Sequence, residues 1–341
     1  MKFKLALFCF LLLFGLIVFI NFSLVNYGFS QFYWQLKIVS STVSKNEFLN
    51  NKSCSQKERI ALKNLDHILK FAKKNGFDSD KNYLKIVEPS HPKLIVASAS
   101  EQFYIKPHLW SFPFLGDVPY KGFFNRKLLY NEIDFLKKGN YDIDTGQVNA
   151  YSTLGILNDP IMPEMLQLNE ADLAETIFHE LVHKYYFEQK KQHINESLAQ
   201  AFGEKLAEKY LQKKYGHASS ELKKYQVKIK KRDSLQIFFR MFALELNRFY
   251  CSQKFANSKN KKKLKQNKYR QLYAEMYKRK LTSKEKLDFL VYKIELSKNA
   301  FFSDYIVYFS NKDSLKEVLD NKFGGSFKLM INELKSKEIV K

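Results

Sequence analysis

His179, Glu180 and His183 form an HExxH pattern within a stretch that is otherwise largely apolar. Residues four apart on a helix project from the same face one turn apart, so both imidazoles can reach one metal ion. Apolar neighbours such as Leu173 and Ile177 predict that this helix lies in the protein interior. An unpaired pair of imidazoles would be costly there. We therefore interpret His179 and His183 as ligands of a buried metal ion, with Zn²⁺ as the expected occupant.

A third protein ligand is expected, because a catalytic zinc ion usually has three protein ligands and one open position. Glu196 is the candidate, since it lies at the start of a second predicted helix, NESLAQAFGEKLAEKY. Ala199 and Gly203 share its face of that helix and would let another helix approach closely. Asn195 is the predicted N-cap. His193 is the alternative third ligand, although the xxGxxH continuation that would favour a third histidine is missing.

Glu180 directly follows the first predicted ligand and is placed to act as a general base. A bound cation greatly raises the acidity of a water molecule, and a neighbouring carboxylate can accept the proton. This pattern favours hydrolytic chemistry. The alternative is a membrane-tethered scaffold or binding protein with a non-catalytic metal site, although such a site would not need Glu180.

The periodicity of apolar residues changes along the chain. From residue 170 onward it is almost entirely helical, whereas the preceding part mixes helices with short β-rich segments interrupted by proline. We predict an α+β, mostly α class, with a mixed part at 37–168 that contains a small sheet and a helical part at 169–341 that carries the zinc site. The predicted helices are 55–76, 127–138, 170–187, 195–215, 222–250, 268–280, 283–306 and 314–319, and the predicted strands are 83–87, 93–97, 102–105 and 144–154.

The N-terminus indicates a membrane location. Lys2 and Lys4 precede residues 5–36, which contain no charged residue, and residues 5–20 are apolar apart from Gly15. With the apolar residues that follow, the run reaches about 20 residues, enough to cross a bilayer as a helix. A cleaved signal peptide is the alternative, but no small-residue cleavage site follows the apolar core. We predict that the first 36 residues form a transmembrane anchor or signal segment, uncleaved, with the rest of the chain outside the cytoplasm.

The formal charge of +22 suggests an anionic partner, but the composition argues against nucleic acid. The chain has 50 Lys and only 7 Arg, and Arg is the better reader of phosphates and bases. The basic run at 259–270 is interpreted as a solvated hairpin tip between two helices, with a lipid- or nucleic-acid-binding patch as the alternative. Cys9, Cys54 and Cys251 are too few for a disulfide framework, and pairing of the last two stays open.

Four sequence blocks occur in an order and spacing that resemble a known family. They are LWSFPFLGDVPYKGFF from Leu109, AYSTLGILNDPI from Ala150, LAETIFHELVHK from Leu173 and NESLAQAFG from Asn195. The chain resembles the bacterial family of predicted zinc aminopeptidases, a gluzincin-type group with an HExxH helix and a downstream NExxA helix. The residues before Asn195, QKKQHI, depart from the acidic, small-residue approach that is usual in that family.

The resemblance implies a function and a set of site residues. His179, His183 and Glu196 would bind Zn²⁺, Glu180 would be the catalytic glutamate, and a peptide or protein would be the substrate, cleaved as by an aminopeptidase. Together with the N-terminal segment, this predicts a protein of a bacterial inner membrane. A single N-terminal anchor would hold it there, with the catalytic domain facing the periplasm or the outside.

Two further functions of such a site are harder to assign from the sequence. Tyr151 and Tyr308 are candidates for the hydrogen bond to the oxyanion, because a phenol can donate from a fixed position. Lys121 in the segment VPYKGFF is a further candidate. An aminopeptidase also needs an acidic group for the free amine of its substrate, and no G-x-M-E-N-type segment supplies one here.

Overall fold

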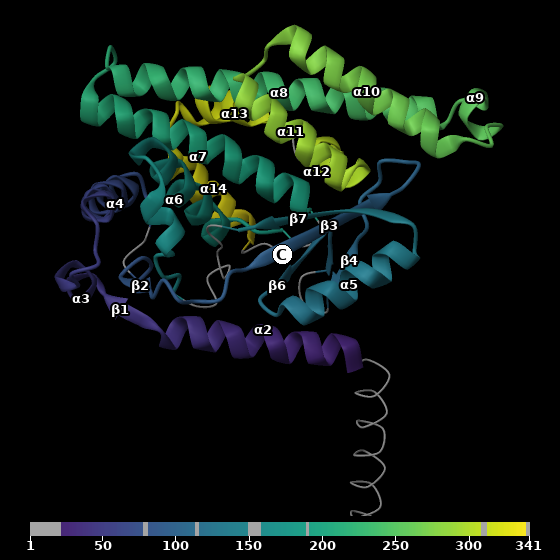
Figure 1. The fold of residues 1–341 in the computed structure, drawn as a ribbon. Helices are drawn as coiled ribbons and strands as arrows, with labels where there is room; N and C mark the ends of the chain where they lie inside the picture. Colours follow the sequence, from purple (N-terminus) through teal and green to yellow (C-terminus); the bar gives the residue numbers. More distant parts are fainter. Residues whose placement is uncertain are drawn as a thin grey trace, which may run out of the picture.

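The computed structural model describes residues 22–77, 81–112, 116–148, 158–188, 191–307 and 312–338. This part of the chain is mostly helical, with small antiparallel sheets toward its N-terminal end. The predicted α+β, mostly α class is therefore confirmed. Figure 1 shows α8 and α10 along one side of the molecule, α2 along the opposite side, and the sheet strands between them.

The elements are bounded as follows. The helices are α2 (Phe22–Ser40), α3 (Lys45–Asn50), α4 (Gln56–Lys74), α5 (Arg126–Lys138), α6 (Glu170–Tyr185), α7 (Gln192–Tyr215), α8 (Ser220–Tyr250), α9 (Gln253–Ala256), α10 (Lys261–Arg279), α11 (Lys284–Ser297), α12 (Asn299–Val307), α13 (Lys312–Phe323) and α14 (Phe327–Glu338), with a 3₁₀ helix at Pro163–Gln167. The strands are β1 (Thr42–Ser44), β2 (Lys85–Val87), β3 (Ile95–Glu101), β4 (Trp110–Phe112), β5 (Gly116–Val118), β6 (Tyr120–Phe123) and β7 (Tyr141–Gln147).

The largest sheet in the described chain has three antiparallel strands in the order β6-β3-β7. Ala97 of β3 lies opposite Lys121 of β6 and Thr145 of β7. α5 packs against β6 and β7, whereas α12 packs against β3 and β7. The sheet therefore joins the N-terminal strands to helices from the far end of the sequence (Figure 1). Two smaller pairs, β1–β2 and β4–β5, complete the β structure of this part.

Two large apolar clusters hold the helices together. The first includes the fully buried Leu65 of α4, Ile177 of α6 and Leu206 of α7, and the second joins α8, α10, α11 and α12. α4 begins with a capping box between Ser55 and Glu58, which explains why the predicted start of this helix is correct. The cysteines of the described chain, one buried in the first cluster and one exposed, are both free.

The strand predicted over 102–105 is wrong. The chain turns there, and both backbone groups of Ile105 are bonded to the side chain of Asn247, its N–H at 2.6 Å and its C=O at 3.1 Å. Phe103 and Ile105 pack against the second apolar cluster. Their apolar character therefore reflects packing on helices rather than pairing in a sheet.

The helix predicted over 283–306 is divided into α11 and α12, which meet at Lys298, where φ is 52°. Asn299 accounts for the break. Its fully buried side chain accepts hydrogen bonds from the hydroxyls of Tyr250 and Tyr269 and donates to backbone carbonyls at the end of β3. Those distant partners draw the chain out of a continuous helix.

The basic run at 259–270 is not a hairpin tip, because α10 begins at Lys261 and contains most of it. Lys265 is only 6% exposed, forms an ion pair with Asp142 of β7 and donates to the carbonyl of Gln102 at 2.7 Å. Part of the charge in this run is therefore internal and ties α10 to the sheet.

Only part of the predicted N-terminal anchor lies in the described chain. Residues 22–36 fall within the predicted anchor segment and form most of α2, which is bonded to the three-stranded sheet. Residues 1–21 lie outside the described chain, so a spanning helix there stays a prediction. None of the described helices is long and apolar enough to cross a membrane.

Candidate metal centre

The two helices that carry the predicted ligands lie directly against each other. α6 begins after Asn169, whose side chain accepts a hydrogen bond from an amide of the first helical turn. A Cβ atom placed on Gly203 of α7 would lie 3.1 Å from the carbonyl oxygen of Glu175 and 3.2 Å from the backbone nitrogen of His179. The close approach predicted at Gly203 is therefore confirmed. It brings the start of α7, with Glu196, to the histidines.

Three potential metal ligands converge at this contact. His179 and His183 of α6 and Glu196 of α7 each offer one ligand atom, and these atoms lie within 4.8 Å of one another. The two histidine Nε2 atoms are 3.2 Å apart, and the Glu196 carboxylate oxygens lie 3.4 and 3.6 Å from them. His193, the alternative third ligand, is exposed and does not belong to this group.

The donor set fits Zn²⁺. Two imidazole nitrogens and one carboxylate oxygen suit a tetrahedral ion with a fourth position for water or substrate. The side chains of His179, His183 and Glu196 are 22, 8 and 27% exposed, so the donors are largely buried but remain accessible to solvent. When both imidazoles are neutral, three electron-pair donors face one another, an arrangement that a cation stabilises.

The charges at the centre affect one another strongly. Burial alone would raise the pKa of Glu196, but hydrogen bonds and charge from His179 and His183 hold it well below its usual range. Burial alone would lower the pKa of His179, but the hydrogen bond with Glu196 and the charge of Glu180 raise it. Burial also raises the pKa of Glu180, against the effect of the two histidines. Such a poorly solvated carboxylate beside metal ligands suits a general base.

Gln192, one turn before Glu196 on α7, links the centre to β6. Its Nε2 donates to Glu196 Oε1 at 2.7 Å and to the hydroxyl of Tyr120 at 2.8 Å. Partners of this kind fix the orientation of a metal ligand. No acceptor within the described ranges takes the hydroxyl hydrogen of Tyr120.

Asn195 has a different role from the predicted one. α7 begins at Gln192 rather than at Asn195, so the predicted N-cap is wrong. The Asn195 side chain, fully buried, instead pairs with the N–H and the C=O of Glu188, each at 2.9 Å. It holds the connection between α6 and α7 and so still helps to place Glu196.

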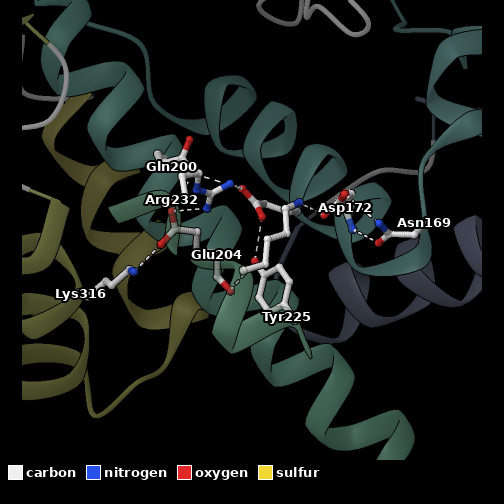
Figure 2. Close-up of polar contacts among 9 residues, drawn as sticks. Asn169, Asp172, Gln200, Glu204, Tyr225, Arg232 and Lys316 are labelled. Atoms are coloured by element: carbon white, nitrogen blue, oxygen red, sulfur yellow. Dashed lines mark hydrogen bonds and ion pairs between the residues drawn. The ribbon is translucent and has the colours of Figure 1, made fainter. Parts of the chain in front are cut away.

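A second polar cluster lies along the same helix contact, away from the metal ligands. Arg232 of α8 forms ion pairs of 2.6 Å with both Glu175 of α6 and Glu204 of α7. Lys316 of α13 also pairs with Glu204, and the hydroxyl of Tyr225 donates to Glu175 at 3.0 Å (Figure 2). We call this set of five residues the Arg232 cluster. It joins four helices and holds the two ligand-bearing helices together.

Of the three residues considered for the oxyanion, Lys121 alone lies in the described chain. Tyr151 and Tyr308 lie outside the described residues. Lys121 forms an ion pair of 2.7 Å with Glu132 of α5. Successive residues of a strand point to opposite faces, so Lys121 faces α5 while its neighbour Tyr120 faces the metal centre.

Sequence reasoning missed other residues near the centre. The buried Tyr83, with φ of 59°, lies close to Glu180 and Asp159; burial and then their charges raise its pKa well above the usual value. Tyr120 and Asp159 lie within the sequence blocks noted above, which was the available signal. No motif or sequence block singled out Tyr83 or Asp304, because the packing of segments far apart in the sequence brings them to the site.

Asp304 of α12 forms no hydrogen bond or ion pair with any other described residue. Asp304 keeps contact with solvent, but the surrounding protein removes part of its hydration. This desolvation, followed by the like charges of Asp144 and Glu196, raises the pKa of Asp304 to about 7. It also acts electrostatically on Tyr120. Asp144, by contrast, is paired with Lys293 at 2.7 Å. Within the described chain, Asp304 is thus a carboxylate without a partner, and it lies near enough to Glu196 for their charges to interact.

The fold and the site define a mostly helical protein with a candidate centre of two histidines and a glutamate, beside a second, partly buried glutamate. The model of the family described as "Putative aminopeptidase" matches residues 26–338, and the chain belongs to this family. No significant match was found among curated proteins or among solved structures. Family membership supports peptide hydrolysis as the activity.

Proposed function

We propose that the protein is a zinc-dependent peptidase in which His179, His183 and Glu196 bind the metal and Glu180 is the general base. One observation supports this above all: the three ligand atoms lie within 4.8 Å of one another, with Glu180 beside them. A structural zinc site usually has four protein ligands, whereas a catalytic site has three and an open position. Three converging ligands favour catalysis over the alternative, a scaffold or binding protein with a non-catalytic metal.

Each residue would have a distinct part in hydrolysis. Zn²⁺ bound by the three ligands would acidify a water molecule and polarise the scissile carbonyl. Glu180 would accept the proton of the attacking water and deliver it to the leaving amine. For the hydrogen bond to the oxyanion we retain Tyr151 and Tyr308 as candidates and add Tyr120, whose hydroxyl is held by Gln192.

We also propose that the enzyme is an aminopeptidase in which Asp304 binds the free amine of the substrate. A substrate ammonium needs an anionic partner near the metal. Asp304 has no cationic partner within the described chain, is exposed, and lies close enough to Glu196 for their charges to repel. A substrate ammonium would offset that repulsion and favour the ionised form of Asp304.

The proposed location is a bacterial inner membrane, with one N-terminal anchor and the catalytic domain facing the periplasm or the outside. The uncharged residues 5–20, which follow Lys2 and Lys4, motivate this proposal. N-terminal sequencing of the mature protein should find the segment retained. A mature chain starting after residue 20 would instead indicate a cleaved, exported form.

The metal and the activity can be tested on one preparation of the full chain in detergent. We expect about one equivalent of zinc and cleavage of a peptide library from the amino end, read by mass spectrometry. Glu196→Gln should weaken zinc binding by more than roughly a hundredfold, because loss of an outer-shell partner alone costs about 10 to 100-fold. His193→Ala, on the same helix but exposed, is the matched control and should keep its zinc.

Two outcomes would overturn these assignments. Full zinc in Glu196→Gln together with loss of zinc in His193→Ala would make His193 the third ligand. Absence of cleavage of any peptide by the zinc-loaded protein would support the scaffold alternative.

A further inference from the structure

α2 has one face that is firmly bound to the folded body. Ile38 is fully buried in the first apolar cluster. The hydroxyl of Tyr27 and the side-chain amide of Gln31 both donate to the carbonyl of Gly122 on β6, at 2.8 and 3.0 Å. Lys121 lies over the Tyr27 ring, 4.6 Å from its centroid. These contacts fix how the helix is rotated about its own axis.

The other face of α2 is largely apolar and has no partner within the described chain. Four of its exposed large residues are aromatic. The exposed set is Phe22 (63%), Phe29 (70%), Phe32 (63%), Tyr33 (58%), Leu36 (50%) and Val39 (39%). Spacings of three, four and seven residues place the set on one side of the helix. A contiguous apolar face of this kind marks an interaction surface rather than chance exposure of single residues.

The chemistry of α2 identifies lipid as the partner. Lys37 is its only charged residue, and it has no acidic residue at all. α11 also exposes Phe289, Tyr292 and Leu296, but charged residues are interspersed among them along that helix. A face without charge, rich in Phe and Tyr, is typical of helices that lie in the interfacial layer of a bilayer.

The position of α2 in the sequence supports the same partner. Its described part follows the apolar residues 5–20, with only Asn21 between them, and no charged residue occurs between residues 5 and 36. The apolar run of residues 5–20, which we expect to lie within a bilayer, would thus end where the exposed face of α2 begins. We infer that α2 lies flat in the interfacial layer of the membrane, with its aromatic face toward the acyl chains and its opposite face holding the folded body.

This arrangement fixes the distance between the metal centre and the membrane. α2 is bonded to Gly122 of β6, and Tyr120 of the same strand is linked through Gln192 to Glu196. The body is then attached along the length of a helix rather than by a flexible tether. The inference does not depend on the catalytic proposal.

Quenching of tryptophan fluorescence by lipids brominated on their acyl chains tests the inference on the full chain in phospholipid vesicles. Trp34→Phe and Trp110→Phe remove the chain's two tryptophans. Single tryptophans are then introduced as Phe29→Trp, Leu36→Trp and, as a matched control on α11, Tyr292→Trp. The control position is 60% exposed, comparable to the α2 positions.

We expect strong quenching of similar extent at residues 29 and 36 and little at residue 292. A helix standing away from the membrane would place residue 36 about 10 Å farther out than residue 29, so quenching at residue 29 alone would overturn the flat orientation. Equally weak quenching at all three positions would overturn lipid as the partner and point to a protein or a second copy of the chain. If the variant without tryptophan does not keep the native circular dichroism spectrum, each new tryptophan is introduced into the unchanged chain instead. The quenching is then measured as the increase over that of the unchanged chain.

Discussion

The contact between α6 and α7 carries two polar clusters that differ in how their charges are balanced. In the Arg232 cluster, two glutamates are paired with Arg232 and Lys316. In the metal centre, Glu196 faces two imidazoles, and no lysine or arginine of the described chain forms an ion pair with it. The same two helices contribute to both clusters, since Glu175 lies four residues before His179 on α6 and Glu204 lies eight residues after Glu196 on α7.

The difference separates a structural cluster from a ligand site. Buried carboxylates are stable when the protein supplies their cations, as Arg232 and Lys316 do. The metal centre has an excess of electron-pair donors instead. With a formal charge of +22, the chain has no shortage of lysines that could fill that place. This comparison supports the proposal that the candidate metal centre accepts a cation from outside.

Removing Arg232 should have the largest effect on stability and a smaller effect on the metal. Arg232→Met leaves the buried Glu204 and the partly buried Glu175 with less compensation and should lower the free energy of unfolding by about 3 kcal/mol. Zinc affinity should change less than about tenfold, since the variant lies beyond the ligands and their outer-shell partners. Urea denaturation and chelator competition measure the two quantities.

Arg279 provides the control for this variant. It pairs with Glu275 on the exposed surface of α10, and Arg279→Met should leave the urea midpoint unchanged. Equal midpoints for the two variants would show that the Arg232 cluster is not a structural element, and the comparison would fail.

A smaller effect is expected at Gly203, which lies between the two clusters. In Gly203→Ala the new methyl group would press on the backbone of Glu175 and His179, so we expect a loss of about 1 kcal/mol. Displacement of α7 should also weaken zinc binding by about tenfold, as outer-shell changes do. Gly28 of α2 has nothing within 4 Å of its Cβ position, and Gly28→Ala should cause neither loss. If both variants bind zinc like the unchanged chain, close helix packing does not place Glu196.

The next prediction concerns Asp304 and the specificity for peptides with a free amino terminus. Asp304→Asn should raise KM for peptides with a free amino terminus by about tenfold, equivalent to about 1.4 kcal/mol, with little change in kcat. Acetylated peptides, which lack the ammonium, should be poor substrates for both forms and unaffected by the change. A uniform loss on both substrates would assign Asp304 a structural role.

The pH dependence of stability gives an independent check. The pKa of Asp304 is raised to about 7 from 3.8, so the folded chain holds a proton that the unfolded chain has released in this window. Ionisation therefore lowers stability as pH rises from about 4 to about 7. In metal-free protein, Asp304→Asn should melt at the same temperature as the unchanged chain near pH 4 and at a higher temperature at pH 8. Equal melting temperatures at both pH values would contradict the raised pKa.

The metal centre was predictable from the sequence, whereas the Arg232 cluster was not. Ligand chemistry restricts the residue types and helical geometry restricts their spacing, so His179, His183 and Glu196 stood out and the structure brings them together. Arg232 lies on another helix, and nothing local distinguishes it from other basic residues of α8. Asp304 likewise depends on how α12 packs on the sheet.

The same distinction applies to the fold. Helices α4 and α5 were predicted closely because their caps, Ser55 and Asn125, are local signals. The predictions failed where a distant partner decides the local structure. Asn247 turns the chain after β3, Asn299 divides α11 from α12, and the pairing of Lys265 with the sheet extends α10 into the basic run.

The central claim, that the centre holds a metal for hydrolysis, is tested most directly by Glu180→Gln. Glutamine keeps the size of the side chain but cannot accept the proton of the attacking water. Metal content and peptide turnover are measured on the same preparation. We predict zinc near one equivalent and turnover lowered by at least roughly a hundredfold, the lower range for loss of a positioned acid–base group. Full zinc with unchanged turnover would remove Glu180 from the mechanism and contradict the account.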